Sequence, residues 1–266
     1  MLGDRHMGNP LKNPPVYVTL AQVRFNPILK LAEFLPSIQE SFRRQNFVSF
    51  ETHQNISIQV TIQDSKAIPQ TVPLVKYLFG NAERTHKFIL DNQSLTIQST
   101  NYVQFENFSS CFLNGLEIID KAVQLAYTER TGLRYLDRVM PQKDETIEKY
   151  LADKVQGLTS NLGGKPVYSF TEAMNEVDNI KLISRVAIQD GPLAFPPDLQ
   201  PLDLVVEDRF VTYTGKSAVL DNDGYIENRE KYSKQKVYEN LNAIHKVIST
   251  AFKATATPYA LKIWNE

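Results

Sequence analysis

The sequence predicts an α+β fold of two similar halves that arose by internal duplication, with largely antiparallel sheets and one long packing helix in each half. One observation is that predicted strands and helices mix without the strict βαβ order of parallel sheets. The others are repeats: Leu-Asp-Asn occurs at 90–92 and at 220–222, and an apolar stripe with helical steps of 4, 3, 4 and 4 also occurs twice. The two stripes are Phe112, Leu116, Ile119, Val123 and Tyr127, and Val237, Leu241, Ile244, Ile248 and Phe252.

A stripe of this kind is common to many amphipathic helices, so the duplication also depends on the segments that flank the two helices. Each helix is followed by an apolar segment that we interpret as a strand, at 132–139 and at 259–264. The expected organisation is a flexible N-terminus over 1–15, a first half over 16–141, a bridging helix within 142–164 and a second half over 165–266.

The first half begins with a strand over 16–25, and Pro27 then opens a helix whose apolar face ends near Phe42. Pro36 lies inside this helix and is expected to interrupt or kink it. Strict alternation of apolar and polar residues over 56–63 predicts a half-buried strand. A less regular stretch with Pro69 and Pro73 follows, and then a hairpin around Asp91.

The bridging helix is predicted from Asp144 as N-cap and from four inward positions. Those positions are Ile147, Leu151, Val155 and Leu158, and the helix is expected to end at Asn161-Leu-Gly-Gly164. In the second half we expect strands near 167–170, 182–188, 205–213 and 217–220, with a proline-rich loop over 195–201. Asp223-Gly224 predicts a tight hairpin turn, and a helix over 234–253 and a terminal strand complete the chain.

The composition is that of an ordinary globular protein, with 42% hydrophobic and 22% charged residues among 266. A formal net charge of −1 provides no global field that would attract nucleic acid or an anionic membrane. No apolar run approaches the length of a membrane span, and the N-terminus lacks the apolar core of a signal peptide. The expectation is therefore a cytoplasmic protein without membrane contact, whose start is either Met1 or Met7.

The usual catalytic and cofactor motifs do not occur in the sequence. The single cysteine, Cys111, excludes a disulfide within the chain and is interpreted as a buried small hydrophobic residue. The four histidines are scattered, without metal-ligand spacing. No cofactor and no metal site is expected. His245, beside the apolar face of the second repeat helix, is interpreted as a boundary histidine with a hydrogen bond, with an acid–base role as the alternative.

A row of arginines is the one constellation that suggests binding. Strand alternation places Arg130, Arg134 and Arg138 on one face of the strand after the first repeat helix, and Asp137 on the other face. Arg24, on the first strand, is expected to join the row. Such a row suits a phosphate, a carboxylate or an acidic peptide. The alternative is an exposed sheet face whose arginines pair with local carboxylates.

Three segments resemble a sporadically distributed bacterial family of about this length. Gly132-Leu-Arg-Tyr-Leu-Asp-Arg138 is similar to its Gly-Leu-Arg-Tyr-x-Asn-Arg motif, and Leu20-Ala-Gln-Val-Arg-Phe-Asn-Pro27 to its Glu-Val-Arg-Phe strand. Leu241-Asn-Ala-Ile-His-Lys-Val-Ile-Ser-Thr-Ala-Phe252 is similar to its Leu-His…Phe helix. Gln22 and Asp137 depart from the commoner Glu and Asn. The family supplies no activity or cofactor, and its patchy distribution suggests accessory or antiviral-defence genes.

Three functions remain open at this point. The first is a non-enzymatic interaction protein, a partner subunit or regulator in an accessory or antiviral-defence system, whose partner is a protein encoded nearby. The second, less favoured because of the neutral net charge, is a nucleic-acid or nucleotide binder that uses the arginine face. The third is an enzyme with an unrecognised site between the halves, which requires Arg134, Asp137 and His245 to converge.

Overall fold

The computed structural model describes residues 11–63, 66–158, 162, 164, 166–200 and 202–266, without the side chains of 55–73. Most of the expected flexible N-terminus and part of the expected glycine cap at 161–164 therefore lie outside the described residues, and so does the expected polar and apolar alternation of side chains over 56–63.

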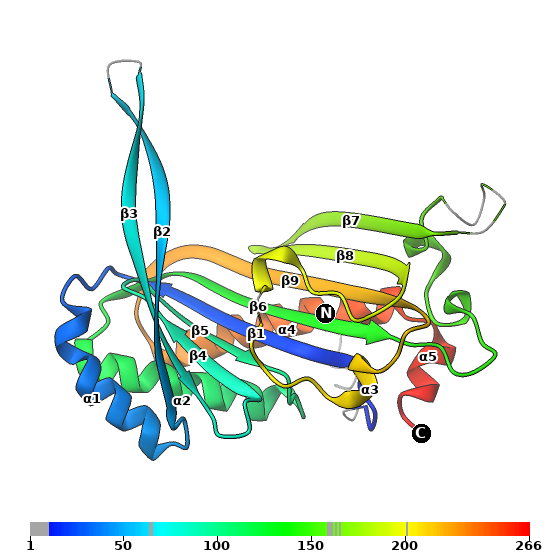
Figure 1. The fold of residues 1–266 in the computed structure, drawn as a ribbon, viewed down its shortest axis with the longest axis horizontal. Coiled ribbons are helices and arrows are strands. Elements are labelled where there is room, and N and C mark those ends of the chain that lie inside the picture. The colour runs from blue at the N-terminus through cyan, green and yellow to red at the C-terminus, as the bar shows by residue number, and fades with distance from the viewer. Residues whose placement is uncertain (1–10, 64–65, 159–161, 163, 165, 201) are drawn as a thin grey trace.

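The fold is α+β with antiparallel strands, as the sequence predicts, but the strands form one large sheet instead of a sheet in each half. Nine strands form the sheet in the order β2-β3-β4-β5-β1-β6-β9-β8-β7 (Figure 1). The strands are β1 (Val16–Phe25), β2 (Ser49–Gln63), β3 (Lys66–Gly80), β4 (His86–Leu90), β5 (Ser94–Ser99), β6 (Tyr127–Val139), β7 (Tyr168–Val177), β8 (Ile180–Asp190) and β9 (Lys216–Lys231). The long strands β6 and β9 pair with each other and join the two expected halves in a single sheet.

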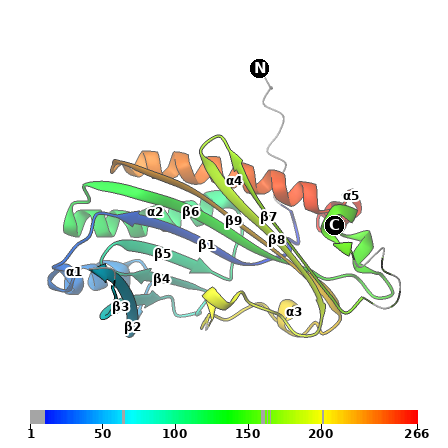
Figure 2. The same cartoon turned by 90° about the horizontal axis from the view of Figure 1, so that it is seen from above.

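The main helices cover one face of the sheet, and the segment between β8 and β9 lies over part of the other (Figure 2). The helices are α1 (Leu31–Arg44), α2 (Phe105–Val123), α3 (Asp208–Val211), α4 (Lys234–Thr255) and α5 (Pro258–Ile263), with 3-10 turns η1 (Ile147–Lys149), η2 (Asp153–Val155) and η4 (Pro197–Leu199). The apolar stripes of α2 and α4 pack in the main core, as their spacing predicts. Their fully packed members are Phe112, Leu116, Ile119, Val237, Leu241, Ile244 and Ile248.

The first half matches the prediction closely, with three differences. Helix α1 begins at Leu31 instead of Pro27, and it continues through Pro36 without interruption. The stretch with Pro69 and Pro73 is not irregular but forms strand β3, which pairs with β2 along a long projecting hairpin (Figure 1). Strand β4 pairs only with the last four residues of β3, so both prolines lie where β3 has one neighbour. Proline is tolerated there because it need not donate to a second ladder.

The bridging helix is not formed. Among the described residues of 142–164 there are only the short turns η1 and η2, and Asp144 has a left-handed φ of 66° instead of an N-cap conformation. Tyr150 accepts a hydrogen bond from the backbone N–H of Thr257, and Leu151 forms a β-bridge with Ala256. The end of α4 therefore fixes this segment in an extended form, and Leu158, expected inward, is exposed.

The tight turn expected at Asp223-Gly224 is wrong, because both residues lie in the interior of β9. Gly224 is opposite Leu133 of β6 and Leu182 of β8. A Cβ atom on Gly224 would lie 2.6 Å from Cγ2 of Ile244, so glycine here allows α4 to approach the sheet closely. The hairpin with Asp91, by contrast, forms as predicted between β4 and β5.

Two more strand predictions in the second half are wrong. The terminal segment forms helix α5, because Thr257 caps it by accepting a hydrogen bond from the backbone N–H of Ala260 and Pro258 occupies its first turn. The segment expected as a strand over 205–213 contains only α3, whose Phe210 is buried against Tyr17. The internal duplication is not shown: one Leu-Asp-Asn segment ends in a turn, and the other lies within β9.

Candidate functional site

The predicted arginine row lies on the face of β6 that is turned away from α2 and α4. Arg24 of β1 is directly opposite Arg130, so both share this face. The row is not an open surface, however, because Arg134 and Arg138 are buried beneath the segment between β8 and β9. Only Arg24 is classed as exposed.

Arg138 holds this covering segment in place. Its guanidinium donates to the carbonyl oxygens of Phe210 and Gly191 and to the hydroxyl oxygen of Ser217. Burial lowers the pKa of Arg138 from its usual value. All three of these partners are neutral, so we assign Arg138 a structural role in fixing the segment.

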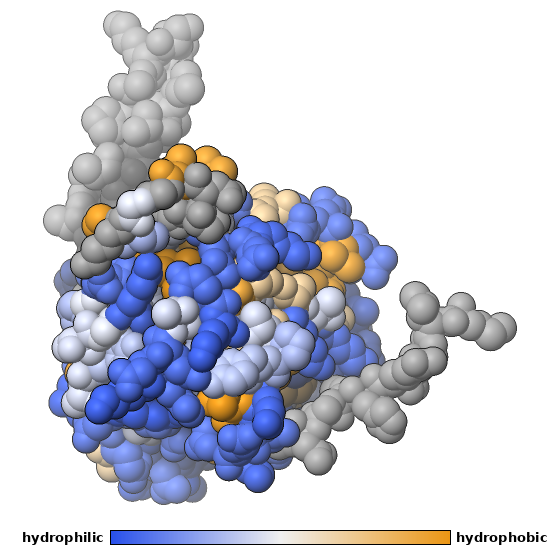
Figure 3. Space-filling view, turned by 90° about the vertical axis from the view of Figure 1, so that its right-hand side faces the viewer, coloured by the Kyte–Doolittle hydropathy of each residue, from blue (hydrophilic) through white to orange (hydrophobic). Residues whose placement is uncertain are grey.

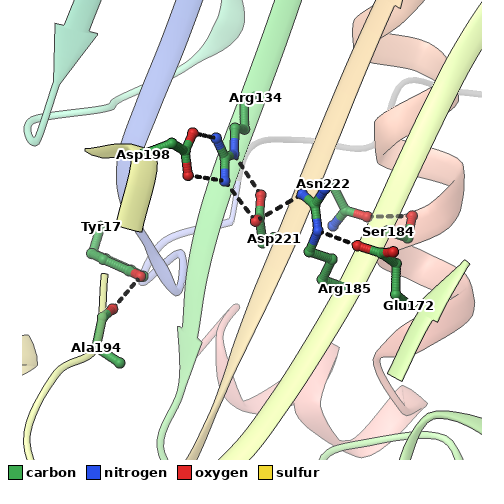
Figure 4. A network of polar contacts seen from close by, with 9 residues as sticks. All are labelled: Tyr17, Arg134, Glu172, Ser184, Arg185, Ala194, Asp198, Asp221 and Asn222. Atoms are coloured by element: carbon green, nitrogen blue, oxygen red, sulfur yellow. Dashed lines mark hydrogen bonds and ion pairs between the residues drawn. The ribbon is translucent and has the colours of Figure 1, made fainter. Parts of the chain in front are cut away.

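Arg134 is part of an ionic network that joins four strands and the proline-rich loop (Figure 4). Its Nε and Nη2 donate to the two carboxylate oxygens of Asp221 at 2.7 and 2.8 Å, and its Nη1 lies 2.5 Å from Oδ2 of Asp198. Burial alone would lower the pKa of Arg134, but the hydrogen bonds to Asp221 and Asp198 outweigh it and raise that pKa.

Asp221 is shared between two arginines. The Nη1 of Arg185 on β8 lies 3.2 Å from Oδ2 of Asp221, and its Nε lies 2.5 Å from Oε2 of Glu172 on β7. Two guanidinium groups thus contact three carboxylates in an alternating chain across the sheet. The buried centre of the network, Arg134 and Asp221, is held by paired hydrogen bonds, whereas Asp198 and Glu172 lie at its exposed ends.

Asp223 adds a fourth carboxylate next to this chain. Burial raises its pKa, although the nearby Arg134 and Arg130 act in the opposite direction. Throughout the described part of the chain, no side chain forms a hydrogen bond or an ion pair with the Asp223 carboxylate. The site therefore contains more negative than positive groups, and its unpaired group is an acid.

These charged residues form the floor of a pocket of about 490 Å³. The proline-rich loop forms one wall with Phe195, Pro196 and Pro197, and the edge strand β7 contributes Tyr168 and Phe170. A pocket with aromatic walls and a few polar groups on its floor is typical of a ligand site. The arrangement suits a positively charged group, since aromatic faces and carboxylates both attract cations.

A smaller basic patch lies beside the pocket on the same face. Arg130 is 4.5 Å from the centre of the Tyr225 ring and donates from Nη1 to Oε1 of Gln22 at 2.9 Å. Lys181 approaches the other part of this ring but is paired with Glu227. Among the described residues, neither Arg24 nor Arg130 has a carboxylate within ion-pair distance.

Asp137 and His245 lie on the opposite side of the sheet from Arg134. The Nδ1 of His245 is 3.1 Å from the hydroxyl of Tyr135, and its ring stacks on Phe105, as expected for a boundary histidine with a hydrogen bond. Burial lowers the pKa of His245 to about 4 and raises the pKa of Asp137 to about 7. A catalytic site made of Arg134, Asp137 and His245 is therefore wrong, because the sheet separates them.

Other candidate chemistry is limited in the described residues. No group of three or more His, Cys, Asp or Glu side chains is placed to hold a metal ion there. Burial raises the pKa of Cys111 to about 11, which keeps its thiol protonated and agrees with its interpretation as a small hydrophobic residue. None of the described helices combines the length and the apolar composition needed to cross a bilayer.

Sequence reasoning missed five of the six charged residues of this site. The five are Glu172 of β7, Arg185 of β8, Asp198 of the proline-rich loop, and Asp221 and Asp223 of β9, and these segments are adjacent to β6 only in the fold. Asp221 and Asp223 are two positions apart and would share one face of a strand. Asn222 between them is also polar and Gly224 follows, so the segment favours a turn and gives no alternating strand pattern.

Comparison with known proteins adds no relative: no family model, no curated protein and no solved structure matches this chain.

Proposed function

We propose that the protein is a non-enzymatic, cytoplasmic binding protein whose pocket receives a positively charged group of a partner. In this proposal it serves as a partner subunit or regulator in an accessory or antiviral-defence system, and the partner is a protein encoded nearby. The observation that carries the proposal is the half-buried, unpaired carboxylate of Asp223 at the floor of an aromatic-walled pocket.

The charge balance supports a cationic group over the acidic one that the arginine row first suggested. Arg134 and Arg185 already face Asp198, Asp221 and Glu172, so an added anion would meet no free guanidinium in this network. An ammonium or guanidinium group would instead provide Asp223 with the partner that it lacks. Such charge-assisted hydrogen bonds are among the stronger contacts available to a binding site.

The rigidity of the network supports binding rather than catalysis. A general acid or base must exchange its proton during the reaction, whereas Arg134 and Asp221 are tied to each other by a pair of hydrogen bonds. Fixed groups of this kind orient a bound molecule without losing much conformational entropy on binding.

The test uses arginine amide as the cationic probe and glutamate and inorganic phosphate as anionic probes, with binding measured by calorimetry. We expect arginine amide to bind and Asp223→Asn to weaken it by about 10- to 100-fold, as is typical for loss of a hydrogen bond to a charged group. Asp203→Asn, at an exposed ion pair with Arg84, is the matched control and should bind normally. Binding of phosphate or glutamate with no binding of arginine amide would overturn the proposal.

The basic patch favours a second candidate function, binding of single-stranded nucleic acid. Arg24 and Arg130 have no carboxylate partner among the described side chains, and the Tyr225 ring beside them offers a surface for base stacking. Fluorescence anisotropy with a labelled oligouridine at low salt tests this candidate. A Kd no tighter than the non-specific range of about 10⁻⁴ to 10⁻⁶ M, or one unaffected by Arg24→Ala together with Arg130→Ala, would rule it out.

The internal duplication also remains a proposal. Its support is the shared stepping of the apolar stripes of α2 and α4, which pack in the same core. An alignment of relatives that detects a repeated strand–helix unit would support it, and one in which the two helices show no similarity would refute it.

A further inference from the structure

Strand β7 forms one edge of the sheet, and its outer side is unpaired within the described residues (Figure 1). It pairs with β8 without a bulge, one residue opposite one, from Tyr168 and Gln189 to Val177 and Ile180. The side chains of Ser169 and Thr171 donate to carbonyl oxygens of the η2 segment. The part of β7 from Glu172 to Val177 has no such contact and is exposed on both faces.

This edge has few of the features that normally prevent a strand from pairing with another chain. Those features are charged side chains, above all lysine, and also proline, a bulge or a very short length. Of these, β7 has only the charges of Glu172 and Glu176. Strand β7 has ten residues, contains no lysine, arginine or proline, and follows a regular register. It also exposes apolar side chains, with Met174 at 59% and Val177 at 42%. The space-filling view from the right-hand side of Figure 1, where β7 begins, shows a mainly hydrophilic surface with a few apolar patches (Figure 3).

The charges of the edge indicate what chemistry a partner needs. On the face that carries the pocket, Glu172, Met174 and Glu176 follow one another along β7. Among the described residues, Glu176 has no ion pair, and the pairing of Glu172 with Arg185 leaves its side chain 48% exposed. On the other face Ala173, Asn175 and Val177 form a small, mainly uncharged row.

A second copy of this chain is a poor occupant of the edge. Pairing β7 with itself would bring two sets of Glu172 and Glu176 into one short ladder that contains no cation. Like charges on neighbouring strands destabilise the pairing. A segment with basic residues at alternate positions would face these glutamates favourably, and its intervening apolar residues would lie along Ala173 and Val177.

We infer that β7 from Glu172 to Val177 is a docking edge for an extended segment of a partner protein in which basic and apolar residues alternate. The segment adds a tenth strand by main-chain hydrogen bonds, and its basic side chains pair with Glu172 and Glu176. Addition of a strand at an unprotected edge is a known mode of peptide recognition. This inference rests on the proposed function as a binding protein and specifies the partner that the protein binds.

The test uses a synthetic decapeptide of alternating lysine and valine, with binding measured by fluorescence anisotropy and hydrogen exchange. We expect binding to slow the exchange of amides within 172–177 and Glu176→Lys to weaken it roughly tenfold, because an attractive cross-strand pair becomes repulsive. Glu239→Lys, which makes the same charge change on the exposed face of α4, is the control and should bind normally. A peptide in which glutamate replaces lysine should not bind.

The outcomes separate this inference from the pocket. Loss of peptide binding in Glu176→Lys but not in Asp223→Asn supports the edge whatever the pocket holds. Loss of peptide binding in Asp223→Asn alone would show that the peptide binds in the pocket, and it would overturn the inference that the peptide docks at the edge. Normal binding in both variants, or binding without protection of 172–177, would also overturn it. If sedimentation shows a dimer that Met174→Lys converts to a monomer, the occupant is a second copy and the inference is wrong.

Discussion

Replacing Gly224 by alanine tests the close approach of α4 to the sheet. An added Cβ would lie 2.6 Å from Cγ2 of Ile244 and 3.3 Å from Cδ1 of Ile248. Carbon atoms in contact prefer about 3.5 to 4.0 Å, so the helix or the Ile244 side chain must move by roughly 1 Å. The φ of Gly224 is not positive, so the expected effect comes from packing and not from backbone strain.

The expected loss of stability follows from this overlap. Inserting an extra carbon into a packed core typically costs about 1 to 3 kcal/mol. Replacing glycine in a regular element recovers about 0.5 to 1 kcal/mol of backbone entropy. At the middle of both ranges, the free energy of unfolding falls by about 1 kcal/mol. For a chain of this size the corresponding decrease in Tm is about 2 to 4 °C.

Urea unfolding and calorimetry of four variants measure this effect: Gly224→Ala, Gly80→Ala, Ile244→Ala and the double variant of Gly224 and Ile244. Gly80→Ala is the control, because a Cβ there lies 3.5 Å from the nearest atom, Cβ of Ser49, at an ordinary contact distance. Ile244→Ala combined with Gly224→Ala should cost less than the sum of the single changes, since the small residue makes room for the new carbon. Equal stability of Gly224→Ala and the wild type, or strict additivity of the pair, would refute this account of the glycine.

Three further predictions concern the charged groups. Asp221→Asn should lower the free energy of unfolding by roughly 2 to 4 kcal/mol in urea, because it leaves a buried arginine pair short of a carboxylate, whereas Asp203→Asn at an exposed pair should cost less than about 1 kcal/mol. The pKa of Asp137 is raised to about 7, so its contribution to stability is complete below about pH 4 and is lost as the pH rises to about 7. Asp137→Asn should therefore gain roughly 2 to 4 kcal/mol over the wild type between pH 4 and 8 in denaturation at each pH, and a constant difference would contradict this. Arg138→Lys should release the segment between β8 and β9, because lysine lacks the planar fork of donors that holds it. Limited proteolysis should then cleave this segment several-fold faster. Unchanged cleavage would show that lysine can replace arginine here.

The elements that the sequence predicts correctly are those whose pattern reflects one repeated contact. The stripes of α2 and α4 each face a single core, and strand β1 and the hairpin after β4 have equally local signals. Hydrophobic periodicity does not predict the structure of a segment that makes different contacts at successive positions. Ile147 and Leu151 have helical spacing, but they are buried because the chain docks around the end of α4.

Only the part of the site that lies on β6 was predictable from the sequence. Alternation along β6 correctly placed Arg130, Arg134 and Arg138 on one face and Asp137 on the other. This alternation could not show that Asp221 of β9 lies opposite Leu136 of β6. That pairing depends on the register between two strands that are far apart in the sequence. The sign of the charge at the site depends on this register, and so the preference for a cation that we propose can be inferred only from the fold.

The order of strands in the sheet has a consequence for synthesis of the protein on the ribosome. Strand β1, the first neighbour of β6 in the sheet, is synthesised before β6. The second neighbour, β9, is synthesised only after the 76 residues 140–215 that separate the two strands. At about 5 to 20 residues per second, the unpaired side of β6, with Leu133 and Leu136, stays open for roughly 4 to 15 seconds. The nascent chain should therefore depend on chaperones until α4 has left the ribosome.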